Sequence, residues 1–333
     1  MPSFMSYHLP LMSETGPIQP MFLPTGFSWI KDIESREGKV QLAEPLKSPQ
    51  HAPAKLRIIK SVRHEDRSCP PAEARILGNL AQLHPNIIRL FCCDLNIVDG
   101  LGYAQMLFEF CRGGDLLQQS RYRRATPFFA LHVVISIAEA LAFLHHGLAP
   151  DRPYLYKRVM HGEAIVHQDI KEGNIFLRFP GSSQGGSLPD IVLADFGLAN
   201  PASQTVPGVG CIGFMSPECR NQTAERLSHK TDIYSFGVMC IRLFDHSTSD
   251  YWPMYKDPEY LRLSSMYDGM ELAPLLRRCV AVDAADRCEF SHEYGSGMLS
   301  TGSLSSIAGL KMQLSLLKRK EQVPHRSYWE VLN

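Results

Sequence analysis

The sequence lacks several features that would indicate a secreted or membrane protein. Its nine cysteines are odd in number and include no Cys-x-x-Cys pair, which argues against a disulfide framework and a structural zinc site. The first 24 residues contain no lysine or arginine and are broken by prolines, unlike a signal peptide. The longest apolar stretch, Leu131 to Leu144, is short for a bilayer span and carries Glu139. We therefore expect an intracellular protein, cytoplasmic or nuclear, that does not enter a membrane.

An excess of charge of either sign is also absent. Lysine and arginine together number 34, and aspartate and glutamate together number 34. Bulk electrostatic attraction to nucleic acid or to an acidic membrane is therefore not expected. Hydrophobic residues make up 44% and charged residues 20% of the 333 residues, as in an ordinary globular protein. This length suffices for one large domain or for two lobes that share a cleft.

Composition divides the chain into three parts. Residues 1–26 are rich in proline, serine and methionine and are predicted to be a flexible leader. Residues 27–290 are predicted to form one folded unit. Residues 291–333 contain a serine- and glycine-rich linker, followed by an apolar stripe over Ile307–Lys320 that predicts a terminal helix. That helix could complete the second half of the folded unit.

The folded unit reads as a small sheet followed by a mostly helical half. From Phe27 to Lys60, short apolar runs alternate with polar breaks, which predicts a meander of antiparallel strands. Apolar residues at helical spacing predict a core helix over Leu131–Leu144. The other expected elements are a strand over Leu56–Lys60, a helix over Ala72–Leu83, strands over Ile87–Cys92 and Ala104–Phe110, and helices near 232–244 and 271–281. The predicted class is α+β.

Three segments carry groups suited to phosphoryl transfer, which requires cations on the phosphates, oxygen ligands for Mg²⁺ and a carboxylate near the attacking hydroxyl. The loop from Val166 to Asn174 contains Asp169 as a candidate for the carboxylate, Lys171 as a candidate cation and Asn174 as a candidate metal ligand. Asp195-Phe196-Gly197 offers a second metal carboxylate, and Ser216-Pro217-Glu218 follows it.

In this order and spacing, the three segments resemble the catalytic loop, the Asp-Phe-Gly motif and the Ala-Pro-Glu motif of the protein kinase family. The resemblance covers about residues 27–290. It implies a bilobal protein kinase fold, with a small N-lobe (about 27–110) of antiparallel sheet plus the αC helix and a larger helical C-lobe (about 111–290). It also implies transfer of the γ-phosphoryl group of ATP, with Mg²⁺, to a protein substrate. Lys171, two places after Asp169, resembles the serine/threonine branch.

The resemblance assigns roles to further residues. Lys60 is similar to the phosphate-binding lysine, and Glu73 to the αC glutamate that pairs with it, although only 13 positions separate them. Asp232 resembles the aspartate that anchors the catalytic loop, and Arg287 the partner of Glu218. The implied catalytic residues are Asp169, Lys171, Lys60 and Glu73; the implied metal ligands are Asn174 and Asp195; the implied nucleotide-binding residues are Gly38, Val40, Lys60, Glu109, Cys111, Asp115 and Phe176.

The sequence departs from the family pattern at three places. Of the glycine-rich loop, only Gly38 and Val40 remain, so either ATP binds weakly or the loop lies elsewhere. Gln168 replaces the arginine before the catalytic aspartate, which leaves a phosphate on Ser203 or Thr205 without an obvious charge partner. Cys211 replaces a threonine that bonds to that aspartate, and a thiol is a weak donor.

These departures keep a pseudokinase open as an alternative, one that acts only as a binding or scaffold module. A small-molecule phosphotransferase with a similar catalytic loop is a more distant alternative, because such enzymes lack the Ser-Pro-Glu element and the aspartate at 232. Two insertions accompany the catalytic loop, Pro150–Glu163 and Phe179–Pro189. We expect both to be solvent loops, with a docking surface as the alternative for the first.

Overall fold

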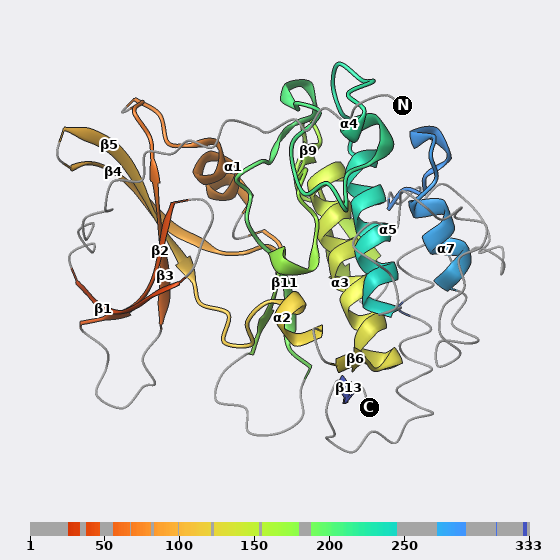
Figure 1. The fold of residues 1–333 in the computed structure, drawn as a ribbon, viewed down its shortest axis with the longest axis horizontal. Helices are drawn as coiled ribbons and strands as arrows, with labels where there is room; N and C mark the ends of the chain where they lie inside the picture. Colours follow the sequence, from red (N-terminus) through yellow and green to blue (C-terminus); the bar gives the residue numbers. More distant parts are fainter. Residues whose placement is uncertain are drawn as a thin grey trace, which may run out of the picture.

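The computed structural model describes most of residues 26–290 and two short pieces beyond them. The described residues are 26–33, 38–46, 56–66, 68–80, 83–98, 100–120, 123–152, 155–179, 188–244, 272–290, 311 and 329–331. A small sheet with one helix and a larger, mostly helical part lie side by side (Figure 1). The expected α+β architecture of two unequal lobes is therefore confirmed. Residues 1–25 of the predicted leader (1–26), the linker at 294–306 and most of the helix predicted over Ile307–Lys320 fall outside the described residues.

The small lobe is a five-stranded antiparallel sheet in the order β1-β2-β3-β5-β4. Its strands are β1 (Phe27–Ile33), β2 (Lys39–Pro45), β3 (Arg57–Arg63), β4 (Leu90–Val98) and β5 (Leu101–Glu109). Helix α1 (Ala72–Leu80) is the one helix described in this lobe and buries Ala74, Leu77 and Leu80. The predicted meander and helix are present, and the described helix covers Ala72–Leu80 of the predicted Ala72–Leu83.

One predicted strand begins later than expected. The apolar run Ile87–Cys92 enters β4 only at Leu90. Ile88 instead donates its backbone N–H to the Leu193 carbonyl of the large lobe (2.9 Å), and the Leu193 N–H returns a bond to Asn86 (2.8 Å). Ile87 and Ile88 are buried. They are apolar because they contact the large lobe, not because they belong to the sheet.

The large lobe is organised around helix α3 (Pro127–His146), which lies beside α5 (Lys230–Phe244) (Figure 1). Thr126 caps the first turn of α3, Pro127 occupies a position where a missing N–H costs nothing, and Gly147 closes the helix at φ 68°. By length and composition α3 could cross a bilayer, but 83% of its most apolar window is buried inside the protein. This pattern is that of a core helix.

The remaining elements of the large lobe are short. The helices are α2 (Leu116–Ser120), α4 (Pro217–Arg220) and α7 (Leu272–Cys279), with 3-10 turns at Glu172–Asn174, Ala202–Gln204 and Ala284–Asp286. The antiparallel strand pairs are β6 (Arg123–Ala125) with β13 (Trp329–Val331), β7 (Leu148–Arg152) with β8 (Leu155–Arg158), β9 (Ile165–Val166) with β12 (Asn200–Pro201), and β10 (Ile175–Arg178) with β11 (Asp190–Leu193).

The first insertion contains a hairpin where a solvent loop was expected. β7 and β8 pair over Leu148–Arg158, and Tyr156 donates its hydroxyl to Glu139 Oε1 at 2.7 Å. Lys311 also contacts the Glu139 carboxylate and lies 4.9 Å from the Tyr156 ring centre. The expected loop is therefore a paired hairpin over Leu148–Arg158, which gives a partner to a glutamate on the core helix, while Asp151, Lys157 and Arg158 are exposed. Of the second insertion, residues 180–187 lie outside the described part.

Candidate active site

Lys60 lies on β3, the middle strand of the small sheet, between Val40 of β2 and Met106 of β5. Its Nζ is 2.9 Å from Glu73 Oε2 and 2.9 Å from Asp195 Oδ1. The short separation in sequence does not prevent the first contact, because β3 ends at Arg63 and Glu73 stands in the first turn of α1. The lysine therefore connects the small lobe's sheet, its helix and the large lobe.

The charges of this triad reinforce one another. Burial alone would lower the pKa of Lys60, but the carboxylates of Glu73 and Asp195 outweigh burial and raise it above its usual value. Burial raises the pKa of Glu73, and Lys60 only partly offsets this effect. The pKa of Asp195 is lowered despite burial because Lys60 stabilises its charged form. The amine accordingly stays protonated and lies beside an ionised Asp195.

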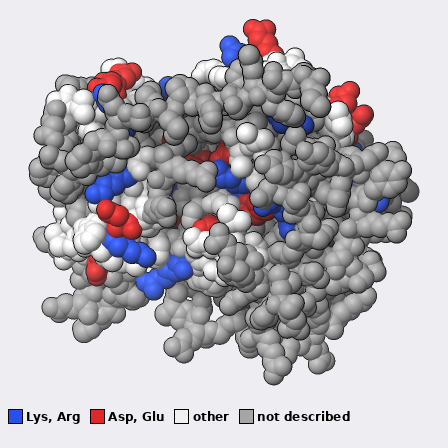
Figure 2. Space-filling model, viewed as in Figure 1, with Lys and Arg blue, Asp and Glu red and all other residues white. Residues whose placement is uncertain are grey.

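Asp195 reaches the cleft through a tight turn after β11. Its φ of 60° is unusual for a residue with a side chain, and the turn is secured by the fully buried Phe196. The Phe196 ring lies edge-on to His167, with ring centres 4.8 Å apart. The Asp195 side chain remains 36% exposed, so it is open to a ligand in the cleft. Acidic and basic side chains lie together in the region between the lobes in Figure 2.

Asp169 accepts hydrogen bonds from three donors. Two lie in the catalytic loop, and one lies in the segment from Asp195 to Glu218, called the activation segment below. Its Oδ1 accepts the backbone N–H of Cys211 at 3.1 Å. Its Oδ2 accepts Asn174 Nδ2 at 2.9 Å and Lys171 Nζ at 2.5 Å. The role expected for a threonine hydroxyl at position 211 is thus taken by the main chain. Because an amide N–H is present whatever the side chain, the weak thiol does not leave Asp169 without a donor from this segment.

The catalytic loop is anchored on Asp232 at the start of α5, as the resemblance implied. Asp232 Oδ2 accepts the His167 N–H at 2.8 Å, and Oδ1 accepts the Gln168 N–H at 2.9 Å. Asp232 is fully buried, yet hydrogen bonding from His145 overcomes burial and lowers its pKa. These bonds hold Gln168 at a φ of 65°, which costs free energy for a residue with a side chain.

Two contacts that support the catalytic loop were not foreseen from the sequence. His145 at the end of α3 donates Nε2 to Asp232 Oδ2 at 3.0 Å. Glu172 is buried and pairs with Arg242 Nε of α5 at 2.9 Å. The His145-His146 pair after an apolar helix was the available signal for the first contact. No sequence signal marked the second, since its partners are 70 positions apart.

Several residues that the resemblance assigned to nucleotide binding make contacts within the protein. The Glu109 carboxylate accepts from Arg178 Nη1 at 3.0 Å and from the Arg89 N–H at 3.0 Å, so its side chain faces the large lobe. Asp115 accepts the Gln118 N–H at 2.8 Å at the start of α2. Burial raises the pKa of the Cys111 thiol to about 12. Nucleotide contacts at 109–111 would therefore come from the backbone.

The predicted phosphate loop lies between β1 and β2, with Glu34 to Glu37 outside the described residues. Gly38 has a φ of 73°, and a Cβ there would approach the Ser61 carbonyl oxygen to 2.3 Å. Close packing of β2 on β3 thus suffices to require this glycine. Val40 is half-buried opposite Lys60, and Phe176 is half-buried on β10 against the core. These nucleotide assignments stay predictions.

Gln168, which stands where the family has an arginine, makes a neutral contact with the segment from Asp195 to Glu218. Gln168 donates Nε2 to the Val206 carbonyl at 2.8 Å. Thr205 is fully buried, and its hydroxyl donates to Ala202 O at 2.9 Å and accepts the Leu227 N–H at 2.7 Å. Thr205 is therefore a poor acceptor for a phosphate.

Ser203 in the same segment is bound to an acid. Its hydroxyl donates to Glu163 Oε2 at 2.8 Å, and its N–H donates to Glu163 Oε1. A phosphate on Ser203 would be placed against this carboxylate rather than against a cation. Glu163 was named in the sequence only as the end of an insertion, so its contact with the segment is a finding of the structure.

The segment ends in a bidentate ion pair. Arg287 Nη1 and Nη2 each lie 2.7 Å from an oxygen of Glu218. Arg287 is also held by the carbonyls of Ala281 and Val282 and its side chain has no exposed surface. Burial opposes ionisation of Glu218, but Arg287 outweighs it and lowers the pKa of the carboxyl. The pairing implied by the resemblance is present.

Comparisons with known proteins agree with this geometry. The family model described as protein tyrosine and serine/threonine kinase matches residues 35–294. Wall-associated receptor kinase-like 21 of Arabidopsis thaliana is 27% identical over 201 residues, which cover 56% of this chain and 28% of that protein. Human mitogen-activated protein kinase kinase kinase 11 is 29% identical over 170 residues, covering 50% and 18%. Mouse serine/threonine-protein kinase Nek5 is 28% identical over 224 residues, covering 65% and 30%. The matched region thus spans less than a third of each of these relatives.

Proposed function

Because the chain belongs to the protein tyrosine and serine/threonine kinase family, we propose that it is an active serine/threonine protein kinase. It would transfer the γ-phosphoryl group of ATP to serine or threonine hydroxyls of a protein substrate. The observation that carries this proposal is the position of Lys60, within 2.9 Å of both Glu73 and Asp195. This alignment supports turnover, because phosphoryl transfer requires a cation for the phosphates beside a carboxylate that can hold the metal.

The chemistry requires positioning and charge more than covalent participation. Asp169 is held by Cys211, Asn174 and Lys171, so its carboxylate is fixed to orient an acceptor hydroxyl and to take its proton. Lys171 brings a cation beside that carboxylate. Lys60 brings a second cation to the opposite side of the cleft, where the phosphates of ATP would lie.

The residues present fit a magnesium ion. Asn174 uses its Nδ2 to bind the Asp169 carbonyl at 2.8 Å, which leaves its side-chain oxygen available as a ligand. Asp195 contributes a partly exposed, ionised carboxylate. Such hard oxygen donors are those that Mg²⁺ prefers. When bound between Asn174 and Asp195, the ion would neutralise charge on the phosphate oxygens.

The proposed setting of the protein is the cell interior, in the cytoplasm or nucleus. All nine cysteines are free thiols, and Cys92 is exposed. A reducing compartment preserves such thiols. The proposed partner is a protein substrate.

The direct test is transfer of labelled phosphate from ATP, with Mg²⁺, to generic protein substrates, beside Asp169→Ala. We expect label on serine or threonine in the wild-type reaction and background in the variant, with both proteins showing the same thermal unfolding. Label on tyrosine alone would contradict the substrate class. Equal labelling by wild type and variant would contradict the assignment of Asp169.

A pseudokinase is the second candidate, and one observation favours it. Gly38, the glycine retained from the phosphate loop, is required by packing alone, because a Cβ at this position would lie 2.3 Å from the Ser61 carbonyl oxygen. Its retention is therefore no sign of contact with phosphate. Calorimetry or thermal shift with ATP and Mg²⁺ separates the candidates: binding accompanied by turnover supports the kinase, and the absence of both supports the pseudokinase.

A further inference from the structure

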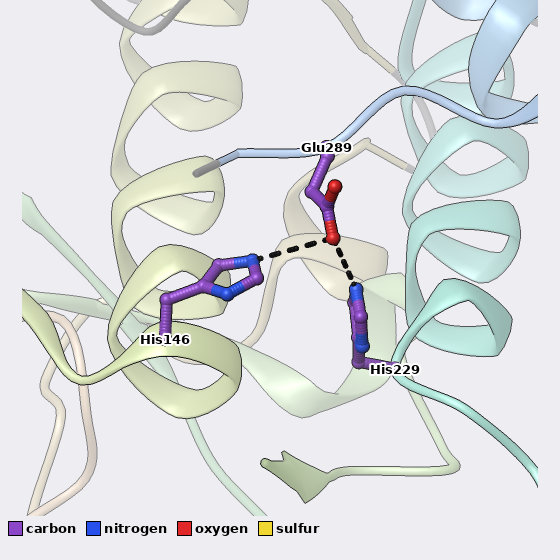
Figure 3. A group of neighbouring side chains, drawn as sticks. All are labelled: His146, His229 and Glu289. Carbon is purple, nitrogen blue, oxygen red and sulfur yellow. Dashed lines mark hydrogen bonds and ion pairs between the residues drawn. The ribbon is translucent and has the colours of Figure 1, made fainter. Parts of the chain in front are cut away.

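A second cluster of ionisable side chains lies apart from the residues of the cleft. It comprises His146 at the last position of α3, His229 just before α5, and Glu289 after the 3-10 turn at Ala284–Asp286. Figure 3 shows the Glu289 carboxylate between the two imidazole rings, with one oxygen facing both. Three segments that are distant in sequence thus direct ligand-type atoms toward one point.

The separations are close to those that a metal ion would require. His229 Nε2 is 2.8 Å and His146 Nε2 is 3.8 Å from Glu289 Oε1. The three ligand atoms all lie within 4.8 Å of one another. In a tetrahedral zinc site, nitrogen and oxygen ligands at about 2.0–2.1 Å from the ion stand about 3.3 Å apart. Small side-chain rotations would therefore bring the three atoms to bonding distance.

One nitrogen of the cluster lacks a hydrogen-bond partner among the described residues. His146 Nε2 is buried and makes no hydrogen bond in the part of the chain that the structure describes. Its contact with Glu289 is longer than a hydrogen bond. A buried polar atom in this condition keeps the full cost of its desolvation, and a cation between the rings and the carboxylate would satisfy it.

The surroundings suit neutral imidazoles and one carboxylate. Burial lowers the pKa of both His146 and His229, which favours the neutral ring, the form that binds metals. Lys230 stands 3.9 Å from the other Glu289 oxygen, Oε2, and so leaves Oε1 to the two rings. His145 lies edge-on to His146, with ring centres 6.1 Å apart.

We propose that His146, His229 and Glu289 form a zinc-binding site that joins α3, α5 and the segment carrying Arg287. Two histidines and a glutamate are an established zinc ligand set, with water at the fourth position. In the absence of metal, His229 Nε2–H donates to the carboxylate. On binding, the ring proton lies on Nδ1 and Nε2 faces the ion. The rival arrangement is a hydrogen-bonded histidine–glutamate cluster without affinity for metal.

The test is zinc titration of the full chain by calorimetry in the presence of a competing chelator. The variants are His146→Gln, His229→Gln and Glu289→Gln, with His161→Gln, an exposed histidine, as the matched control. We expect one zinc ion per wild-type chain, and affinity weaker by at least about tenfold in each cluster variant. The control should bind as wild type does. No saturable binding, or binding that survives all three substitutions, overturns the proposal.

Two further measurements distinguish ligation from folding effects and from thiol binding. Saturating zinc should raise the Tm of wild type and His161→Gln but not that of the cluster variants, whose circular dichroism should match wild type. Cobalt(II) in place of zinc should give the visible absorption of a four-coordinate site with nitrogen and oxygen ligands. A thiolate-to-cobalt charge-transfer band would assign the metal to cysteines such as the exposed Cys92 and overturn the proposal.

Discussion

The two sides of the cleft are built in different ways. On the phosphate side, the structure places Lys60, Glu73 and Asp195 in direct ionic contact. On the side of the activation segment, an arginine and a threonine of the family pattern are missing. There the main chain of Cys211 binds Asp169, and Gln168 binds a carbonyl.

The difference follows from what each side must supply. Neutralising the charge of a phosphate requires an opposite charge, and on this side of the cleft a side chain, Lys60, carries it. Position, by contrast, can be supplied by any donor at the right distance, including an amide that every residue except proline possesses. A substituted motif residue therefore weakens the case for catalysis on the phosphate side more than on the other.

The largest effect is expected from Lys60→Met. Removing the cation from beside Asp195 should lower kcat by at least about a hundredfold, as loss of one electrostatic stabiliser commonly does. Lys157→Met is the control, because that lysine is 60% exposed and pairs with Asp151 outside the cleft. Steady-state kinetics with protein substrate measure the change. Near wild-type activity in Lys60→Met would show that the phosphate side of the cleft does not depend on the charge of this side chain.

The Glu218–Arg287 pair is the exception on the activation-segment side, since it is ionic. Glu218→Ala leaves a buried guanidinium with only carbonyl partners, so we expect a loss of about 3 kcal/mol in the free energy of unfolding. Urea denaturation measures it, with the exposed Glu225→Ala as control. If the two variants lose equally little, the pair is not a structural anchor.

The phosphate loop should affect ATP affinity more than chemistry. Backbone amides orient the phosphates best where glycine permits close approach. We expect a KM for ATP near the upper end of the usual range, about 1 mM, and a several-fold decrease in Glu34→Gly plus Arg36→Gly. Kinetics against ATP with excess Mg²⁺ measure both. A KM that is low in wild type and unchanged by the glycines would place the phosphates elsewhere.

Ser203 tests whether a negative charge helps or harms the activation segment. Because its hydroxyl contacts the Glu163 carboxylate, Ser203→Glu should lower kcat a few-fold, whereas Ser203→Ala should stay closer to wild type. Phosphatase treatment should not lower the wild-type rate. Activation by Ser203→Glu, or a collapse of activity after phosphatase, would show that the segment uses a cation from another part of the chain.

The smallest effect is expected at Cys211. Cys211→Ala and Cys211→Thr both keep the backbone N–H that binds Asp169, so kcat should remain within about twofold of wild type, the scale of a surface substitution. The same protein-substrate assay measures both. A tenfold gain in Cys211→Thr would mean that the hydroxyl, rather than the amide, limits the position of the carboxylate.

Much of the fold and site could be predicted because the relevant residues are local in sequence. Asp169, Lys171 and Asn174 fall within one loop, and a nine-residue window suffices to identify them. The first three strands of the small sheet follow one another, so alternation and turns predicted a meander there, whereas the pairing of β3 with β5 came only from the structure. The pairing of Lys60 with Glu73 was expected only through the resemblance to the kinase family, and the structure shows it at 2.9 Å.

Other features depended on where distant segments meet. Ile87 and Ile88 read as strand because they are apolar, yet they contact the large lobe. The insertion after α3 forms a hairpin whose Tyr156 satisfies Glu139, a buried acid that the sequence left unexplained. The hydrogen bond from the Cys211 backbone N–H to Asp169 could not be predicted from side-chain identity.

Amino-acid identity specifies which chemical groups this protein possesses and the order in which the chain presents them. The tertiary structure decided which of those groups meet: Arg242 with Glu172 across 70 positions, His145 with Asp232 across 87, and His229 with Glu289 across 60. The physical reason is that side-chain identity is a local property, whereas hydrogen bonds and ion pairs act over about 3–4 Å. Only the packed core fixes distances on that scale between remote parts of the chain.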